Sequence, residues 1–203
     1  MENKKYEFTG VAKETWAGTL HQIRAIRDFR NVEAGDIGGW IEKEENLSHD
    51  GDCWVYENAV VYENAVVYEN AEVCGNAEVC GNARVCGDAE VCGNAEVCGN
   101  ARVFGDAEVF GDARVFGDAR VFGDAVVFRD AVVTTTVKTF GNAFIYRITV
   151  TDKHIKIGCQ QHLKNEWKAF EDREIIKMDG KKALEFWRMF KPVLESLGLF
   201  EEV

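Results

Sequence analysis

Cys159 and His162 are the pair of residues in this chain with the types and the spacing for nucleophilic chemistry. They form a C-x-x-H pattern, in which an imidazole could activate a thiol as a nucleophile. A buried cysteine beside a capping histidine would produce the same pattern. This explanation accounts for the pattern equally well, so a chemical role of the pair stays open and we predict no catalytic residue.

Five of the seven cysteines follow a strict spacing of six residues. They are Cys74, Cys80, Cys86, Cys92 and Cys98. This spacing matches neither the C-x-x-C pattern of a zinc site nor a normal disulfide framework, so we predict no metal and no cofactor. The chain begins with charged residues and no secretory signal, so we expect a cytoplasmic protein with reduced thiols.

These cysteines belong to a longer six-residue repeat. Alanine recurs at every sixth position from Ala59 to Ala131, and a typical unit is V-C-G-N-A-E, as in Val73–Glu78. The frame continues to Leu47 on one side and Ala143 on the other, which gives seventeen units. A period of two places Ala and Val on one side of a short strand and the variable residues on the other.

Each unit ends in a two-residue corner, Gly followed by Asn or Asp. Glutamate or arginine replaces this glycine in four units, so we expect the following Asn or Asp to adopt the left-handed conformation of the turn. The four replacements are Glu57, Glu63, Glu69 and Arg129. One strand and one corner per six residues close most simply into a three-sided coil. The sequence thus predicts a triangular parallel β-helix of five to six coils, each of eighteen residues, over residues 47–148.

The repeat resembles the hexapeptide repeat of left-handed parallel β-helices, in which an aliphatic residue and a small residue four positions later both point inward. Matching pairs are Val73/Ala77, Val85/Ala89 and Val115/Ala119. The segments 35–40 and 51–56 and the G-N-A units are similar to uncharacterised bacterial and phage β-helix proteins. The resemblance implies a mainly β fold and left-handed coiling, against the usual crossover preference.

Caps are expected at both open ends of such a helix. Residues 1–46 would form an N-terminal β cap, with apolar anchors at Tyr6, Phe8, Trp16, Leu20, Ile23, Ile26 and Phe29. Residues 149–203 would form a C-terminal α+β cap or a partner-binding module. There the sequence predicts a hairpin of residues 144–151 and 154–158, short helices over 163–170 and 174–178, and an amphipathic helix over 181–191 that Pro192 stops or kinks.

Residues eighteen apart should stack, so each face of the β-helix can be written out. One column is basic and alternates with aromatic residues: Arg84, Arg102, Arg120 and Lys138, beside Phe104, Phe122 and Phe140. Arginine next to an aromatic ring could bind a stacked base, a phosphate or an acidic edge of a partner. Alternatively, these side chains cover only one another, because sequence duplication yields such columns freely.

Acidic residues form two further columns, and phenylalanines a third group. The acidic columns are Glu72, Glu90 and Glu108, and Asp88, Asp106 and Asp124. Stacked aspartates could bind calcium, but we favour their tolerance of turns as the explanation. Phe110, Phe116 and Phe128 would form an apolar patch larger than a monomer exposes. We therefore expect a homo-oligomer, a dimer or trimer, or a cap packed over the patch.

Charge and composition exclude some partners. The net charge of −11, most of it within residues 47–148, argues against non-specific binding to nucleic acid. No apolar run is long enough to cross a bilayer, so we expect no membrane association.

Left-handed β-helices of the kind that this chain resembles are often trimeric acyltransferases with a histidine at the subunit interface as general base. Residues 50–153 contain no histidine, and the four in the chain are His21, His49, His154 and His162. We therefore predict a non-catalytic scaffold or binding protein, such as a phage-encoded accessory or anti-defence factor that binds a host macromolecule. The alternatives are an oligomeric sponge for an anionic nucleotide and, less favoured, a hexapeptide-type acyltransferase.

Overall fold

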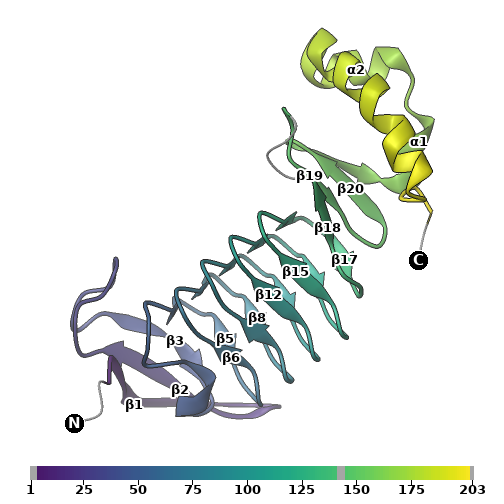
Figure 1. The fold of residues 1–203 in the computed structure, drawn as a ribbon. Helices are drawn as coiled ribbons and strands as arrows, with labels where there is room; N and C mark the ends of the chain where they lie inside the picture. Colours follow the sequence, from purple (N-terminus) through teal and green to yellow (C-terminus); the bar gives the residue numbers. More distant parts are fainter. Residues whose placement is uncertain (1–3, 141–144, 202–203) are drawn as a thin grey trace. The chain divides into compact units, whose positions relative to one another are not determined.

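The computed structural model describes residues 4–140 and 145–201. It contains two compact units, Met1–Thr136 and Val137–Val203, and each is described by itself. The first holds the repeat and an N-terminal hairpin, and the second holds a small sheet and the helices (Figure 1). Ala143 and Phe144, which the sequence placed at the end of the repeat and the start of a hairpin, lie outside the described residues.

The repeat forms a parallel β-solenoid of about five turns, as the sequence predicted. Its strands make three parallel sheets, in the orders β3-β5-β8-β11-β14-β17, β16-β13-β10-β7-β4 and β15-β12-β9-β6, where β3 is Ile37–Ile41. The strands are β4 (Trp54–Val55), β5 (Val60–Val61), β6 (Val66–Val67), β7 (Glu72–Val73), β8 (Glu78–Val79), β9 (Arg84–Val85), β10 (Glu90–Val91), β11 (Glu96–Val97), β12 (Arg102–Phe104), β13 (Glu108–Val109), β14 (Arg114–Val115), β15 (Arg120–Phe122), β16 (Val126–Val127) and β17 (Val132–Val133). The left hand of the coiling stays a prediction.

The eighteen-residue coil is confirmed by the strand register. Glu90 pairs with Glu72 and Glu108, and Val91 pairs with Val73 and Val109. The repeat Ala and Val side chains point inward and are fully buried, as Ala89 and Val91 illustrate with relative exposures of 0%. Small side chains are required because three sheets enclose a narrow interior that larger ones would overfill.

The turn position was predicted wrongly. The glycine position, and not the Asn or Asp after it, adopts the left-handed conformation, with φ between 69° and 76° from Gly75 to Gly117. Glu57, Glu63, Glu69 and Arg129 share it, with φ of 54° to 62°. The three glutamates offset their strain with a hydrogen bond, because each carboxylate accepts the backbone N–H of the glycine one coil on, at 2.7 to 2.8 Å.

The Asn and Asp side chains form hydrogen-bonded ladders along the corners. Asn58 donates to Asn76, Asn76 to Asn94 and Asn94 to Asp112, at 3.0 to 3.2 Å. In a parallel corner ladder, Asn can both donate and accept, whereas Asp can only accept and so ends the run of donors. The ladder, and not tolerance of a left-handed φ, explains this residue choice.

Two glycines separate the contributions of backbone strain and close packing at the corners. A Cβ on Gly81 would lie 2.7 Å from the backbone N of Gly99, whereas a Cβ on Gly123 meets nothing within 4 Å. Both have positive φ, of 71° and 61°. We expect Gly123→Ala to lower the free energy of unfolding by about 1 kcal/mol through strain alone, and Gly81→Ala by at least ~1 kcal/mol more through overpacking. Urea unfolding measures both, and equal losses would contradict this account.

The regular register stops at both ends of the solenoid. Leu47 pairs with Val67 and Arg120 pairs with Thr136, each two residues away from an eighteen-residue step. The seventeen-unit frame predicted from the sequence is therefore too long. The corner at the second slip has Thr135 and Thr136 in place of Gly and Asn, so neither the left-handed turn nor the amide ladder continues.

A β cap covers the start of the solenoid. β1 (Tyr6–Thr15) and β2 (Gly18–Ala25) form an antiparallel hairpin, β2 pairs with β3 (Ile37–Ile41), and β3 joins the first parallel sheet through β5. The 3-10 helix η1 (Glu44–Asn46) follows. Of the predicted anchors, Tyr6, Leu20, Ile23 and Phe29 are buried and Phe8 is half-buried, but Trp16 and Ile26 are exposed because they lie at the hairpin turn and beyond the end of β2.

Lys5 is a buried cation in this cap that the sequence did not suggest. Its ammonium donates to the carbonyl oxygens of Gly51 at 3.2 Å and Cys53 at 2.7 Å, and lies 3.1 Å from the Cys53 sulfur. Burial lowers the pKa of Lys5 and raises that of Cys53. The lysine thus supplies donors to backbone carbonyls of the first coil that have no earlier coil to pair with.

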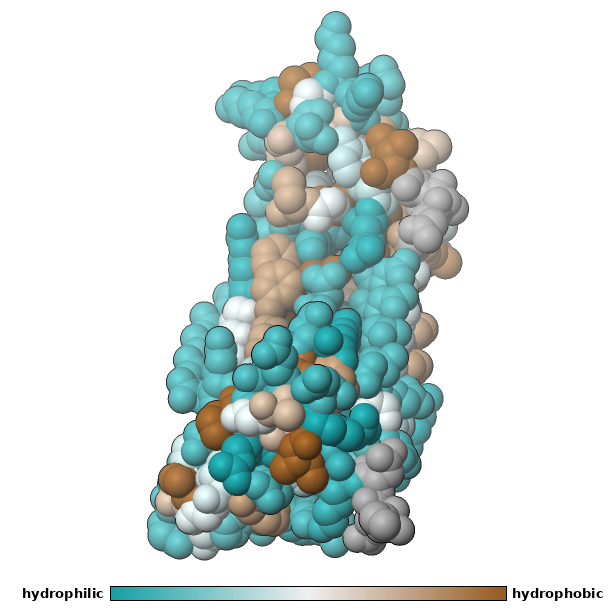
Figure 2. Space-filling model, turned by 90° about the vertical axis from the view of Figure 1, so that its left-hand side faces the viewer, coloured by the Kyte–Doolittle hydropathy of each residue, from teal (hydrophilic) through white to brown (hydrophobic). Residues whose placement is uncertain are grey.

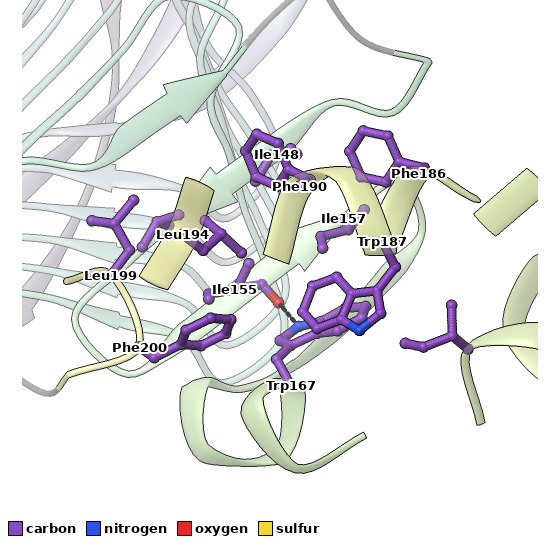
Figure 3. Packing of buried hydrophobic residues seen from close by; sticks show 12 residues of the cluster. Ile148, Ile155, Ile157, Trp167, Phe186, Trp187, Phe190, Leu194, Leu199 and Phe200 are labelled. Atoms are coloured by element: carbon purple, nitrogen blue, oxygen red, sulfur yellow. Dashed lines mark hydrogen bonds between the residues drawn. The ribbon is translucent and has the colours of Figure 1, made fainter. Parts of the chain in front are cut away.

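The second unit is a four-stranded antiparallel sheet with two helices. Its sheet order is β18 (Lys138–Phe140), β19 (Ile148–Val150), β20 (His154–Ile157) and β21 (Gln160–Leu163), followed by α1 (Lys164–Ala169) and α2 (Asp172–Ser196). Its core gathers side chains from sheet and helices, and the indole N–H of Trp167 donates to the Ile155 carbonyl at 2.6 Å (Figure 3).

The predicted hairpin turn between β19 and β20 is confirmed, and so is the break between two helical stretches, where Asp179 and Gly180 leave helical geometry. Pro192 does not end the helix, which continues to Ser196. Phe190 and Leu194, on either side of it, are buried in the core, and their packing offsets the hydrogen bond that proline cannot make. Among the described residues, no helix combines the length and apolar composition that a bilayer crossing requires.

Candidate binding surface

One sheet of the solenoid carries stacked arginines beside stacked phenylalanines. We call this the basic–aromatic face: Arg84, Arg102 and Arg120 with Phe104 and Phe122, on β9, β12 and β15. Arg102 is in register with both Arg84 and Arg120, and Phe104 with Phe122. Because alternate residues of a strand point to the same side, both columns face away from the buried valines.

The three arginines form no direct ion pair with a carboxylate in the part of the chain that the structure describes. All three are exposed. Two other arginines are paired with glutamates of the other sheets: Arg30 with Glu72 at 3.0 Å and Arg114 with Glu96 at 3.4 Å. Parallel strands lie about 4.8 Å apart, so the three guanidinium groups repel one another unless an external anion lies between them.

The aromatic half of the face is partly covered by its own stacking. The Phe104 and Phe122 rings lie 5.5 Å apart with an interplanar angle of 14°, and both residues are half-buried. The suggestion that ladder neighbours cover one another is thus correct for the ring faces between them. What remains open to a partner is the outer part of a rigid apolar strip beside the arginines.

Lys138 and Phe140 do not belong to this face. The register slip that pairs Arg120 with Thr136 ends the column, and Lys138 instead pairs with Val150 in the antiparallel sheet of the second unit. Phe140 packs edge-on against Phe190, with ring centroids 5.5 Å apart, in the core of that unit. Both residues were predicted to extend the basic column, and the predicted stacking is wrong for both.

The acidic columns are present but partly used within the chain. Glu72, Glu90 and Glu108 stack on β7, β10 and β13, where Arg30 binds Glu72. Asp88 begins the aspartate column that continues with Asp106 and Asp124, and it accepts a hydrogen bond from Asn70 at 3.2 Å.

The three phenylalanines of the predicted oligomer patch lie on two faces. Phe110 and Phe128 stack with ring centroids 5.5 Å apart beside the Glu column. Phe116 follows β14 on another sheet and is 39% exposed. The view in Figure 2 is largely hydrophilic, with hydrophobic side chains in small separate groups. The expected single continuous patch is therefore not formed by these residues.

Two of the cysteine columns are disulfide-bonded, contrary to the sequence prediction. Cys74 is bonded to Cys92 and Cys80 to Cys98, with Cα atoms 4.6 and 4.7 Å apart. In-register parallel strands place stacked Cα atoms within the range that a disulfide spans. Cys53, Cys86 and Cys159 are free thiols.

The cysteine column on the sheet of β8 and β11 includes a carboxylate that sequence reasoning missed. The ligand atoms of Glu78, Cys80 and Cys98 all lie within 4.8 Å of one another. The hydroxyl of Tyr62, one coil earlier, donates to Glu78. Burial and this hydrogen bond raise the pKa of Tyr62. The eighteen-residue step from Tyr62 to Cys80 and Cys98 was the available signal, because it stacks the three side chains.

Cys159 and His162 have different surroundings. Cys159 is exposed in the turn between β20 and β21. It lines a largely apolar cavity of about 40 Å³, at which the Tyr146 hydroxyl donates to Asp179 at 2.6 Å. His162 packs against Trp167 and Phe170 and lies 3.8 Å from a Glu166 oxygen. The cavity is far smaller than clefts that enclose small-molecule substrates.

The six-residue repeat, the eighteen-residue step between paired strands and the buried columns of Ala and Val define the fold. This chain is a hexapeptide-repeat parallel β-solenoid. No profile of a known protein family matches its sequence. It is 41% identical over 56 residues to an Escherichia coli (strain K12) protein described as "Uncharacterized acetyltransferase YdcK". That match spans 28% of this chain and 16% of the length of the relative.

Proposed function

We propose that this chain is a non-catalytic binding scaffold whose basic–aromatic face holds an acidic segment of a partner protein. The observation that carries the proposal is the in-register column of three exposed arginines without a salt bridge among the described residues. A rigid solenoid fixes their spacing before binding, so little ordering entropy is lost on association. A macromolecule of a host cell, as the resemblance to phage proteins implies, is a partner consistent with this proposal.

The charge distribution favours an acidic protein segment over nucleic acid. The net charge of −11 repels a long polyanion, whereas a short acidic strand contacts only the local basic column. A strand of alternating acidic and aromatic residues would place carboxylates on the guanidinium groups and rings on the Phe104–Phe122 strip. A second copy of this chain is also a candidate partner, since it carries columns of glutamate.

Replacing the arginines tests the proposal. We expect the triple variant Arg84→Gln/Arg102→Gln/Arg120→Gln to bind a labelled peptide with alternating Glu and Phe about 100-fold more weakly. Each lost charged contact removes roughly 1 kcal/mol of binding free energy. Fluorescence anisotropy at several salt concentrations measures the affinity, and the variant should also lose most of the salt dependence.

The control is the matched column on another sheet, Glu72→Gln/Glu90→Gln/Glu108→Gln, which should bind the peptide as tightly as the unmodified chain. Equal affinity of the arginine variant and the unmodified chain would contradict the proposal. Tighter binding of a single-stranded oligonucleotide or a mononucleotide than of the peptide would favour the nucleotide sponge instead.

An acetyltransferase is the second candidate, because the E. coli relative carries that description. Residues 50–153 contain no histidine that could serve as a general base. His21 lies in β2 of the cap, with its ring 5.1 Å from Phe8, and His49 stacks on Tyr6 at 4.3 Å. Release of thiol from acetyl-CoA by the purified protein, together with a thermal shift on adding acetyl-CoA, would favour this candidate over the scaffold.

A further inference from the structure

The two disulfide columns have the same local sequence but different neighbours. Both repeat Glu-Val-Cys at an interval of eighteen residues, beginning at Glu72 and at Glu78. At the first, Arg30 binds the Glu72 carboxylate at 3.0 Å. At the second, Tyr62 donates to the Glu78 carboxylate, which lies with both sulfurs in one group of potential ligands. The chain therefore contains a two-cysteine site with a carboxylate and a matched site whose glutamate is engaged elsewhere.

We propose that Cys80, Cys98 and Glu78 bind a zinc ion when the disulfide between the cysteines is reduced. Thiolate sulfur and carboxylate oxygen are both zinc ligands, and a water would complete the tetrahedron. Two Zn–S bonds of about 2.3 Å at a tetrahedral angle place the sulfurs roughly 3.8 Å apart. Stacked strands with Cα atoms 4.7 Å apart can present sulfurs at that separation as well as at disulfide distance.

The surroundings of this site favour a fixed coordination geometry. Cys80 is buried, and Leu20, Tyr62 and Cys80 form a small core with Ala17 and Trp40 packed against it. Packing of these side chains against the site strengthens its charge interactions. The Tyr62 hydroxyl orients the Glu78 carboxylate, as second-sphere donors do for metal-binding carboxylates.

Conversion of the Cys80–Cys98 disulfide to the zinc-bound dithiolate takes up two electrons, and the two protons gained on reduction are released when zinc binds. Two molecules of a thiol reductant supply two electrons and two protons to the Cys80–Cys98 bond and leave as their own disulfide. Zinc binding then releases the two thiol protons, because only thiolates coordinate the ion. In the reverse direction, exchange with a small-molecule disulfide takes up the two electrons as it is reduced to two thiols, re-forms the Cys80–Cys98 bond and releases the zinc ion. The site thus binds zinc only in the reduced protein.

Titration with Co²⁺ as a spectroscopic substitute for zinc tests the inference on the full chain, reduced with a phosphine and kept without oxygen. We expect one equivalent to give the absorption of thiolate-to-cobalt charge transfer, and zinc to displace it. The oxidised protein should give none. Glu78→Gln should weaken binding by at least about tenfold, and Cys80→Ser/Cys98→Ser should abolish the signal.

The matched variant Cys74→Ser/Cys92→Ser keeps the proposed ligands and should retain the full signal. The inference is overturned if this variant loses the signal, if Cys80→Ser/Cys98→Ser keeps it, or if the reduced, unmodified chain gives none. Circular dichroism of each variant establishes that it is folded, and a folded Glu78→Gln variant that binds Co²⁺ as tightly as the unmodified chain would also overturn it.

Discussion

Val67→Asp should abolish cooperative folding of the solenoid at neutral pH, whereas Val66→Asp should leave it intact. Val67 is 0% exposed, in the interior that the three sheets enclose. A carboxyl group buried in this way has its pKa raised by three to five units, which corresponds to a loss of about 4–7 kcal/mol at neutral pH. The total stability of a domain is typically ~5–15 kcal/mol, so one substitution removes much of it.

Val66 is the matched control because it is the preceding residue of the same strand. It points outward, is half-buried and is in register with Arg84. An aspartate there gains a cross-strand ion pair, worth about 0.2–1 kcal/mol. Urea unfolding followed by circular dichroism measures both variants.

The pH dependence of the Val67 variant has a definite sign. The folded-state pKa of the new carboxyl lies above its unfolded value, so the penalty is complete above the folded pKa. It declines as the pH falls toward the unfolded pKa, because both states are then protonated. Equal losses for the Val66 and Val67 variants, or a penalty that grows on acidification, would contradict the assignment of Val67 to the interior.

The interior columns could be predicted from the sequence because strand alternation and an unbroken period leave few alternatives. A six-residue period fixes which residues face inward, and three sides per coil fix the eighteen-residue stacking. The pairs Arg84–Arg102 and Phe104–Phe122 follow directly and are confirmed. The same argument predicted the basic–aromatic face without any knowledge of packing.

Features that depend on contacts between coils were predicted less well. The presence of Glu57 at the glycine position suggested that no left-handed turn occurs there, but its carboxylate offsets the strain by accepting the Gly75 N–H. The salt bridge between Arg30 and Glu72 joins residues far apart in the sequence, so strand alternation could not predict it. The arginine column ends where Thr136 pairs with Arg120. The sequence signals this end, because the corner there lacks Gly and Asn, but a frame defined only by the inward-facing positions does not detect it.

Reduction of the disulfides should lower the stability of the solenoid by about 3 kcal/mol or more. Each bond closes a loop with a sequence separation of 18, for which loop-closure entropy in the unfolded chain predicts roughly 3 kcal/mol. The loops of Cys74–Cys92 and Cys80–Cys98 overlap, so the second bond constrains a chain that the first has already shortened. We therefore expect the two contributions to sum to less than twice the single value.

Alkylation before and after reduction, followed by mass spectrometry, establishes the bonds. The folded, oxidised chain should offer only Cys53, Cys86 and Cys159 for alkylation once denatured, and the reduced chain all seven cysteines. Cys74→Ser/Cys92→Ser should lose part of the stability, and addition of a reductant should lower it further through Cys80–Cys98. If alkylation labels all seven cysteines without reduction, or reductant leaves the unfolding midpoint unchanged, the solenoid is held by its buried columns and corner ladders alone. In the reduced protein, added zinc should raise the midpoint of urea unfolding only in chains that keep both Cys80 and Cys98. A ligand that binds the folded state alone stabilises that state.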